Sequence, residues 1–173
     1  MKALIVSDNH GDQKILRDIQ DKFAKQVDVL IHCGDSELPN DSAEMTDFQA
    51  VKGNNDWGLN YPSQLSLTVK GTKFLVVHGV HDQVNYSLTP LMLKVQSLGA
   101  QVVCYGHTHQ LAVSMDAGTL FINPGSISLP RGEYSRIGGT FAIVEVTKKQ
   151  FIVDYYNRNC SPISELHFEF NRS

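Results

Sequence analysis

The first part of the chain alternates short apolar runs with one amphipathic stretch. Residues 2–7 and 27–34 are rich in aliphatic and β-branched side chains, which predicts two buried strands. Between them, apolar side chains recur at helical spacing over residues 12–27, which predicts an amphipathic helix with Asp12 as its N-cap. This strand-helix-strand order predicts that the two strands pair in parallel through a right-handed crossover.

The rest of the chain is dominated by apolar runs of strand length, separated by turns that contain glycine or lysine. They predict strands or hairpins at residues 47–54, 64–79, 101–106, 111–125, 138–156 and 163–170. One further helix is expected at residues 86–100, with Pro90 in its first turn and Gly99 at its end. We therefore expect a single α/β (α+β) domain over residues 1–173, with two mixed β-sheets packed face to face and flanked by helices in an αββα sandwich.

Composition and charge narrow the class of protein. The chain is 42% hydrophobic with a net charge of −3, so it has no basic surplus for a large nucleic-acid or membrane face. We expect neither a leader segment nor a membrane-spanning segment, and hence no membrane partner. The three cysteines, Cys33, Cys104 and Cys160, are odd in number and far apart, so we expect no disulfide framework and a reducing, cytoplasmic location.

Five of the apolar runs end in a group of Asp, Asn or His side chains next to a glycine. The groups are SDNHGD from residue 7, HCGDS from residue 32, KGNNDW from residue 52, VVHGVHD from residue 76 and YGHTH from residue 105. Because parallel strands bring their carboxyl ends to one edge of a sheet, these groups are expected to converge. Each group alone is a weak signal, but five in one short chain predict a shared site.

The side chains in these groups predict a metal centre. The expected metal-ligating donors are Asp8, His10, Asp35, Asn54, His78, His107 and His109. Oxygen and imidazole donors without cysteine suit Mn²⁺, Fe²⁺, Zn²⁺ or Ni²⁺ better than Mg²⁺ or Ca²⁺. The set is too large for one tetrahedral ion and fits two ions that share a carboxylate. We therefore predict a cofactor of two divalent ions, manganese in the first place, with Ni, Fe or Zn as alternatives.

The order of these groups resembles the pattern of the calcineurin-like metallophosphoesterases, over roughly the first three-quarters of the chain. The family pattern D-x-H, G-D, G-N-x-D, H and G-H-x-H is matched by Asp8-Asn9-His10, Gly34-Asp35, Gly53-Asn54-Asn55-Asp56, His78 and Gly106-His107-Thr108-His109. The short length and the stretch INPGSISLPR at residues 122–131 are similar to the small YfcE-type bacterial phosphodiesterases. The resemblance implies that one ion takes Asp8, His10, Asp35 and His109 and that the other takes Asp35, Asn54, His78 and His107. In this arrangement Asp35 bridges the two ions, which hold a hydroxide nucleophile.

The sequence departs from the family pattern where many members carry a histidine that protonates the leaving group. Here that position is Asn55, and an amide cannot supply general acid catalysis, which is typically worth about 10²–10⁴-fold. Substrates with good leaving groups are therefore favoured, and phosphodiesters over alkyl monoesters. Three further residues are open to two interpretations each. His81 is a substitute proton donor or an exposed loop residue, Arg131 binds a substrate phosphate or is a surface charge, and Asp56 orients a ligand or closes a turn.

Three kinds of function are compatible with this pattern. The first is a metal-dependent hydrolase that cleaves a small phosphodiester, and also activated monoesters, through a metal-bridging hydroxide. The alternatives are a catalytically weak interaction scaffold, like the phosphoesterase-like subunit of retromer, or a phosphomonoesterase or nuclease on the same site. Loss of a donor would favour the scaffold, and all the expected donors are present. Long nucleic acids are disfavoured as partners by the lack of a basic surplus, and homo-oligomer formation is left open.

Overall fold

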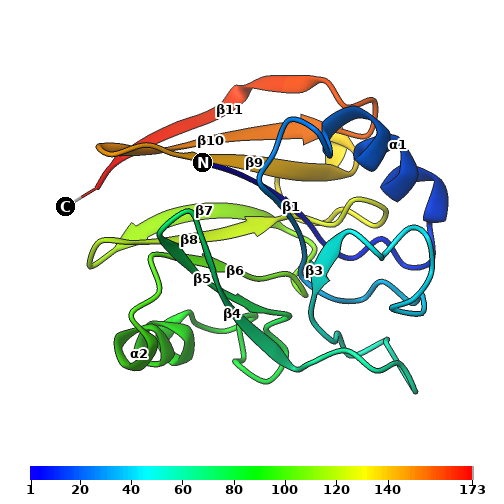
Figure 1. Ribbon diagram of the computed structural model, residues 1–173, viewed down its shortest axis with the longest axis horizontal. Coiled ribbons are helices and arrows are strands. Elements are labelled where there is room, and N and C mark those ends of the chain that lie inside the picture. Colours follow the sequence, from blue (N-terminus) through cyan, green and yellow to red (C-terminus); the bar gives the residue numbers. More distant parts are fainter. Residues whose placement is uncertain (173) are drawn as a thin grey trace.

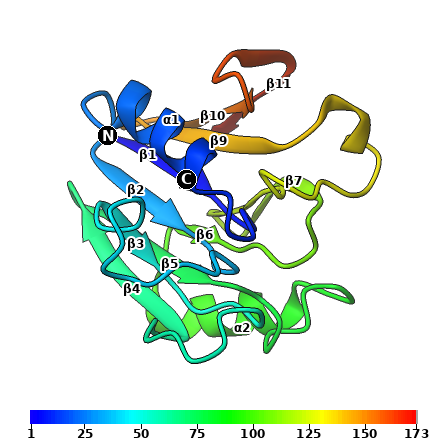
Figure 2. The same cartoon turned by 90° about the vertical axis from the view of Figure 1, so that its right-hand side faces the viewer.

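The computed structural model describes residues 1–172, which form two β-sheets packed face to face (Figure 1). The first sheet contains β1 (Lys2–Val6), β2 (Val29–His32), β3 (Phe48–Ala50), β9 (Thr140–Val146), β10 (Gln150–Asn157) and β11 (Pro162–Asn171). The second contains β4 (Gln64–Val69), β5 (Thr72–Val77), β6 (Val102–Cys104), β7 (Leu111–Asp116) and β8 (Thr119–Pro124). The helices α1 (Gln13–Phe23) and α2 (Thr89–Leu98) lie on the outer faces of opposite sheets (Figure 2). A short 3₁₀ helix, Ser135–Ile137, precedes β9. The predicted fold class, two packed mixed β-sheets flanked by helices, is confirmed.

The helices form where the sequence predicts them, although both are shorter. Asp12 caps α1, because its carboxylate accepts the backbone N–H of Ile15 at 3.2 Å. The helix ends at Phe23, and Val27, which the apolar spacing placed inside it, packs on the same core from the connection to β2. At the end of α2, Gly99 adopts a left-handed conformation with φ 64°.

Strand order places the carboxyl ends of several strands from both sheets at one edge. Strands β1, β2 and β3 run parallel to one another in the first sheet, and strands β5, β6 and β8 do so in the second. The apolar runs are continuous because the strands are covered on both faces. In β1, Ala3 and Ile5 face the core between the sheets, whereas Leu4 and Val6 pack under α1.

Leu16 tests how firmly α1 is attached to the first sheet. Its side chain is 0% exposed and packs in the core under α1. We expect Leu16→Ala to lower the free energy of unfolding by about 2–5 kcal/mol, because it leaves a cavity that neighbours fill only in part. Urea denaturation in the presence of a metal chelator measures this change. The exposed Asp21 of the same helix is the control, and Asp21→Ala should change stability by no more than about 0.5 kcal/mol. Equal effects of the two variants would contradict this packing.

Candidate metal centre

The predicted donors converge at the shared edge of the two sheets, as the pattern of strand ends predicts. They arrive from different strands: Asp8 and His10 follow β1, Asp35 follows β2, Asn54 follows β3, His78 follows β5, and His107 and His109 follow β6. Two sets of donor atoms lie within 4.8 Å of one another, namely Asp8, His10 and His109, and Asp8, Asp35 and His78. Both sheets therefore contribute donors to the site. The order of the strands along the sequence did not reveal this division between two sheets.

In the first set, two imidazole nitrogens face each other, namely Nε2 of His10 and Nε2 of His109. His10 donates its Nδ1–H to the Glu37 carboxylate at 2.7 Å, and His109 donates its Nδ1–H to the carbonyl oxygen of Leu129 at 2.8 Å. Because both partners can only accept, each ring in its neutral form carries a lone pair on Nε2. The neighbouring Asp8 carboxylate raises the pKa of His109, so a positive charge is favoured at this position. These two Nε2 atoms lie 3.2 Å apart. Two lone pairs at this distance repel, and a cation that binds both removes the repulsion.

The Asp8 carboxylate completes this set and carries a full negative charge. Its Oδ1 is buried without a hydrogen-bond partner among the described residues and lies 3.4 Å from Nε2 of His109. Burial on its own raises the pKa of Asp8, but the contacts with His109, His78 and Ser7 outweigh it and hold the pKa below its ordinary value. A buried anionic oxygen without a donor, beside two imidazole lone pairs, has the chemistry of a metal site.

In the second set, Asp35 and His78 lie next to Asn54. His78 donates its Nδ1–H to the carbonyl oxygen of Cys33 at 2.8 Å, so its Nε2 also presents a lone pair. That atom lies 3.0 Å from Oδ1 of Asn54 and 3.5 Å from Oδ2 of Asp35. The side chains of Asp35 and His78 are both 2% exposed, so these acceptors are close together in a buried position. A second cation fits here for the same electrostatic reason.

His107 lies beside the second set but outside it. Its ring centroid is 5.1 Å from that of His78, and the Asn85 amide donates to its Nε2 at 2.9 Å. Burial and the neighbouring His78 lower the pKa of His107, so the ring is neutral at pH 7. The lone pair that a metal ion would use is thus taken up by Asn85, and metal binding at that nitrogen requires the amide to move away.

The backbone at the donors is held in a conformation that few residues adopt. Asp8, His10, Asp35, His107 and His109 all have φ between 46° and 68°. Such left-handed residues cost on the order of 1–3 kcal/mol each, and Asp and His tolerate the conformation better than most side chains. Strain of this kind at five donors of one site is the signature of a functional constraint.

Three glycines allow the donor loops to approach one another. A Cβ atom at Gly106 would overlap the Ser7 hydroxyl, and one at Gly53 would overlap the Asp35 carboxylate. At Gly34, which also has φ 96°, a Cβ would lie 2.8 Å from Nδ1 of His78. These are the glycines of the motif positions, and no larger residue fits any of them without moving a donor loop.

Asp56 fixes two of the donor loops to each other. Its carboxylate is 0% exposed and accepts the backbone N–H groups of Asp35, Gly53 and Glu37 at 2.9, 2.7 and 2.7 Å, together with the Ser36 hydroxyl at 3.3 Å. The sequence left open whether Asp56 orients a metal ligand or closes a turn. Its contacts with the backbone of the Asp35 loop agree with the orienting role. The loop after β2 and the loop after β3 are held as one unit.

Two residues that sequence analysis missed support the donors. Glu37 orients His10 through the bond described above, and it also has a left-handed backbone with φ 56°. His32 is fully buried, accepts the N–H of Gly34 at 3.1 Å and donates to Asn9 at 2.8 Å, so it ties the second donor loop to the first. Burial lowers the pKa of His32 to about 4 and keeps the ring neutral. His32 lies inside a quoted motif and Glu37 comes directly after it, but only their long-range partners reveal their roles.

The predicted substrate contacts are spread around the centre. Asn55 donates its backbone N–H and its side-chain amide to the two oxygens of Asp35, each at 2.7 Å. Arg131 is exposed, and its backbone N–H donates to the carbonyl oxygen of His109 at 3.0 Å. His81 lies outside both donor sets, in the wall of a cavity next to Asn54.

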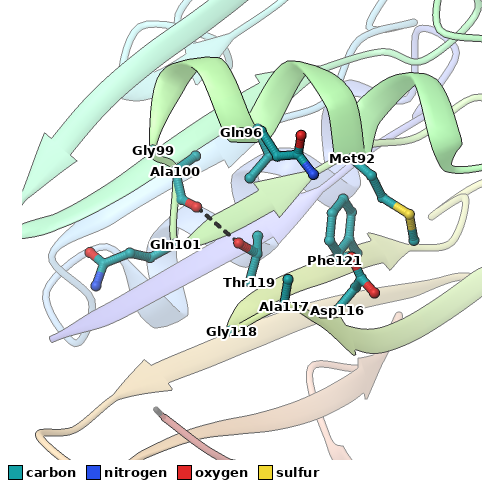
Figure 3. Close-up of a pocket in the computed structure, with 11 residues that line it drawn as sticks. Met92, Gln96, Gly99, Ala100, Gln101, Asp116, Ala117, Gly118, Thr119 and Phe121 are labelled. Carbon is teal, nitrogen blue, oxygen red and sulfur yellow. Dashed lines mark hydrogen bonds between the residues drawn. The ribbon is translucent and has the colours of Figure 1, made fainter.

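Another cavity, of about 350 Å³, lies at the opposite end of β6 from His107 and His109 (Figure 3). Backbone groups and neutral side chains form most of its surface, and the Thr119 hydroxyl bonds the carbonyl oxygen of Ala100 at 3.1 Å. Among the described residues that line it, Asp116 is the one with an acidic or basic side chain. The acid-base and metal-binding groups are therefore concentrated at the other end of the sheets.

Comparison with known proteins identifies the family. A model of the calcineurin-like phosphoesterase superfamily domain matches residues 1–149. The chain is 35% identical to a probable metallophosphoesterase, YsnB, of Bacillus subtilis, with 96% of both chains covered. It is 29% identical to a phosphodiesterase of Methanocaldococcus jannaschii, over 87% of this chain and 96% of that one. The chain therefore belongs to the calcineurin-like phosphoesterase superfamily, which supports its assignment as a hydrolase.

Solved structures support the same fold. A predicted phosphoesterase from Streptococcus pneumoniae TIGR4 superposes with a TM-score of 0.95 at 34% identity, covering 99% of this chain and 97% of that chain. Vps29 of Cryptosporidium parvum and YfcE of E. coli superpose with TM-scores of 0.74 and 0.66 at 16% and 20% identity, over at least 97% of each chain, and show the fold alone. Neither α1 nor α2 is long and apolar enough to cross a lipid bilayer.

Glu37 provides a test of the first donor set. We expect Glu37→Gln to weaken binding of Mn²⁺ by about 10–100-fold, because a neutral amide makes His10 a poorer electron donor and orients it less firmly. Isothermal titration calorimetry of the metal-stripped protein measures the affinity. The exposed Glu165 supplies the matched control, and Glu165→Gln should bind as the parent does. An unchanged affinity in Glu37→Gln would mean that His10 is not a ligand held by Glu37.

Asp56 provides a test of the frame that holds the donor loops. Asp56→Ala leaves three backbone N–H groups without their acceptor, and each such loss costs about 1–3 kcal/mol. We expect the free energy of unfolding to fall by about 3 kcal/mol or more, with chelator present so that metal affinity does not contribute. The comparison is Asp47→Ala, at an exposed carboxylate shortly before β3. A loss below about 1 kcal/mol would show that water or a neighbour replaces the carboxylate.

Proposed function

We propose that this protein is a dinuclear metal-dependent phosphodiesterase that hydrolyses an ester bond of a small phosphodiester. The observation that carries the proposal is the pair of facing Nε2 atoms of His10 and His109, together with the unpartnered Oδ1 of Asp8. A cation between the three acceptors would remove their mutual repulsion. The proposed ligands are the seven donors of the sequence motifs, with Asp35 placed between the two ions.

Two bound divalent ions supply positive charge that holds phosphoryl oxygens and makes hydroxide available at neutral pH. The donor residues would hold the two ions in place, and the carboxylates among them would reduce the net positive charge of the site. Asp8 and Asp35 contribute two negative charges, so a positive excess is left for an anionic phosphate. The hydrogen bonds of His10, His78 and His109 through Nδ1 fix each ring with Nε2 toward the centre. The donors are therefore preorganised before substrate arrives.

Asn55 determines which esters are good substrates. Its amide bonds Asp35, and it cannot donate a proton to a departing alkoxide at neutral pH. A leaving group that is stable as an anion needs no such proton, so activated esters are favoured. The name of the archaeal relative, a phosphodiesterase, supports the preference for diesters.

The interaction scaffold is the second candidate, and the Vps29-like fold is the observation that favours it. A scaffold has no need of the strained backbone and the facing lone pairs described above, which favour the enzyme. Manganese as the native metal and a cytoplasmic location stay predictions. The three buried, free cysteines accord with a reducing location.

A hydrolysis assay tests the proposal. Metal-stripped protein receives bis(p-nitrophenyl) phosphate or p-nitrophenyl phosphate, and Mn²⁺ is titrated back. We expect metal-dependent turnover that is faster for the diester. Asp35→Asn should lose more activity than His10→Ala, and more than the roughly 10–100-fold typical of residues that only support ligands, because it would contact both ions. A smaller loss in Asp35→Asn would contradict the bridging role. Bound metal without turnover of either ester would favour the scaffold.

A further inference from the structure

A cavity of about 310 Å³ lies directly beside the candidate metal centre. Its walls come from the loops that follow β3 and β5 and from the segment that leads into β4. The side chains relevant here are Lys52, Asn54, Trp57, Ser63, Val80 and His81. Asn54 both lines the cavity and contacts His78 in the second donor set. A group in the cavity is therefore adjacent to the position where the phosphate would be held.

Trp57 gives this cavity its chemical character. The side chain is 84% exposed, so it does not anchor the loop in the core. Its backbone is nevertheless fixed, because its N–H donates to the carbonyl oxygen of Asn55 at 2.9 Å and the preceding Asp56 is fully buried. A large exposed indole on a fixed loop, next to a metal centre, offers a flat face on which a planar ring can stack.

The other lining residues select the kind of ring. Val80 adds an apolar surface, whereas Lys52, Ser63 and His81 supply hydrogen-bonding groups. Aromatic stacking combined with polar contacts to the ring edge is how proteins bind a single unstacked nucleobase. The volume lies at the lower end of the range of about 300–1,000 Å³ for small-molecule sites, which suits one ring system and not a polymer.

We propose that this cavity binds the nucleobase of the substrate, stacked on Trp57, while its phosphate is held by the metal centre. The inference rests on the proposed function and narrows the substrate to a small nucleotide phosphodiester. The net charge of −3 favours such a short substrate over a long strand, whose binding depends on many basic contacts.

Trp57 itself supplies the readout for binding, because it is the one tryptophan of the chain. The Mn²⁺-loaded protein is titrated with adenosine 5′-monophosphate and, in parallel, with ribose 5-phosphate, which has the phosphate but lacks the base. We expect the nucleotide to quench the Trp57 emission and to bind about 5- to 100-fold more tightly than ribose 5-phosphate, which should leave the emission unchanged. Equal affinities, or no quenching by a nucleotide that is shown by calorimetry to bind, would overturn the proposal.

A kinetic comparison separates this inference from the proposed function. Thymidine 5′-(p-nitrophenyl) phosphate and methyl p-nitrophenyl phosphate release the same leaving group, and one of them carries a base. We expect Trp57→Ala to lower the ratio of kcat/KM for the nucleoside ester to that for the methyl ester by roughly 5- to 100-fold, mainly through KM. The control is Leu93→Ala, which removes an exposed apolar side chain from α2 and should leave the ratio as it is.

The outcomes are distinguishable. If the parent protein hydrolyses neither ester, the proposed function fails, and the fluorescence titration still decides whether the cavity binds a base. If both esters are hydrolysed and Trp57→Ala leaves their ratio unchanged, the nucleobase site fails while the phosphodiesterase stands.

Discussion

Repulsion between electron-pair donors that face one another is the constraint on which the rest of this structure depends. His10 and His109 direct Nε2 lone pairs at each other across 3.2 Å, and the Asp8 oxygen beside them has no donor among the described residues. Without other constraints, these groups would be more stable when hydrated. They keep their positions because a hydrogen bond at Nδ1 fixes each ring and the preceding strand fixes each backbone. The fold thus supplies the free energy that holds acceptors together until a cation neutralises them.

The strain is distributed over bonds that join loops from different strands. Asp8 and His10 donate their backbone N–H groups to the carbonyl oxygens of Gly34 and Asp35, each at 3.1 Å, which extends the parallel pairing of β1 and β2 beyond the strands themselves. In the loop that follows β8, the Ser126 hydroxyl donates to the carbonyl oxygen of Asp8 at 2.8 Å and so links the second sheet to the first donor loop. The left-handed backbone conformations are therefore stabilised jointly, because each donor loop is hydrogen-bonded to a loop from another part of the core.

Much of this arrangement could be predicted from the sequence, because its signals are local. An apolar run that ends in glycine and Asp, Asn or His marks both a strand and a donor at the strand's carboxyl end, and the helices are marked by their spacing and caps. Partners distant in sequence leave no such mark. Glu37 bonds His10 across 27 positions and Asn85 bonds His107 across 22, and neither pairing has a periodicity or a motif. The division of the donor-bearing strands between two sheets is hidden for the same reason, since strand order is fixed by contacts between distant segments.

The loop after β3 shows how the chemistry and the choice of substrate are separated within a few residues. Asn54 and Asn55 contact the donor sets, Asp56 fixes the loop through bonds to the backbone of the loop after β2, and Trp57 projects outward with 84% of its side chain exposed. The carboxylate of Asp56, and not the indole, makes the side-chain hydrogen bonds that hold this loop to the loop after β2. We therefore expect a change at Trp57 to alter the wall of the neighbouring cavity and to leave the donor atoms in place. One rigid frame can therefore serve different phosphate esters, because only its exposed margin needs to change.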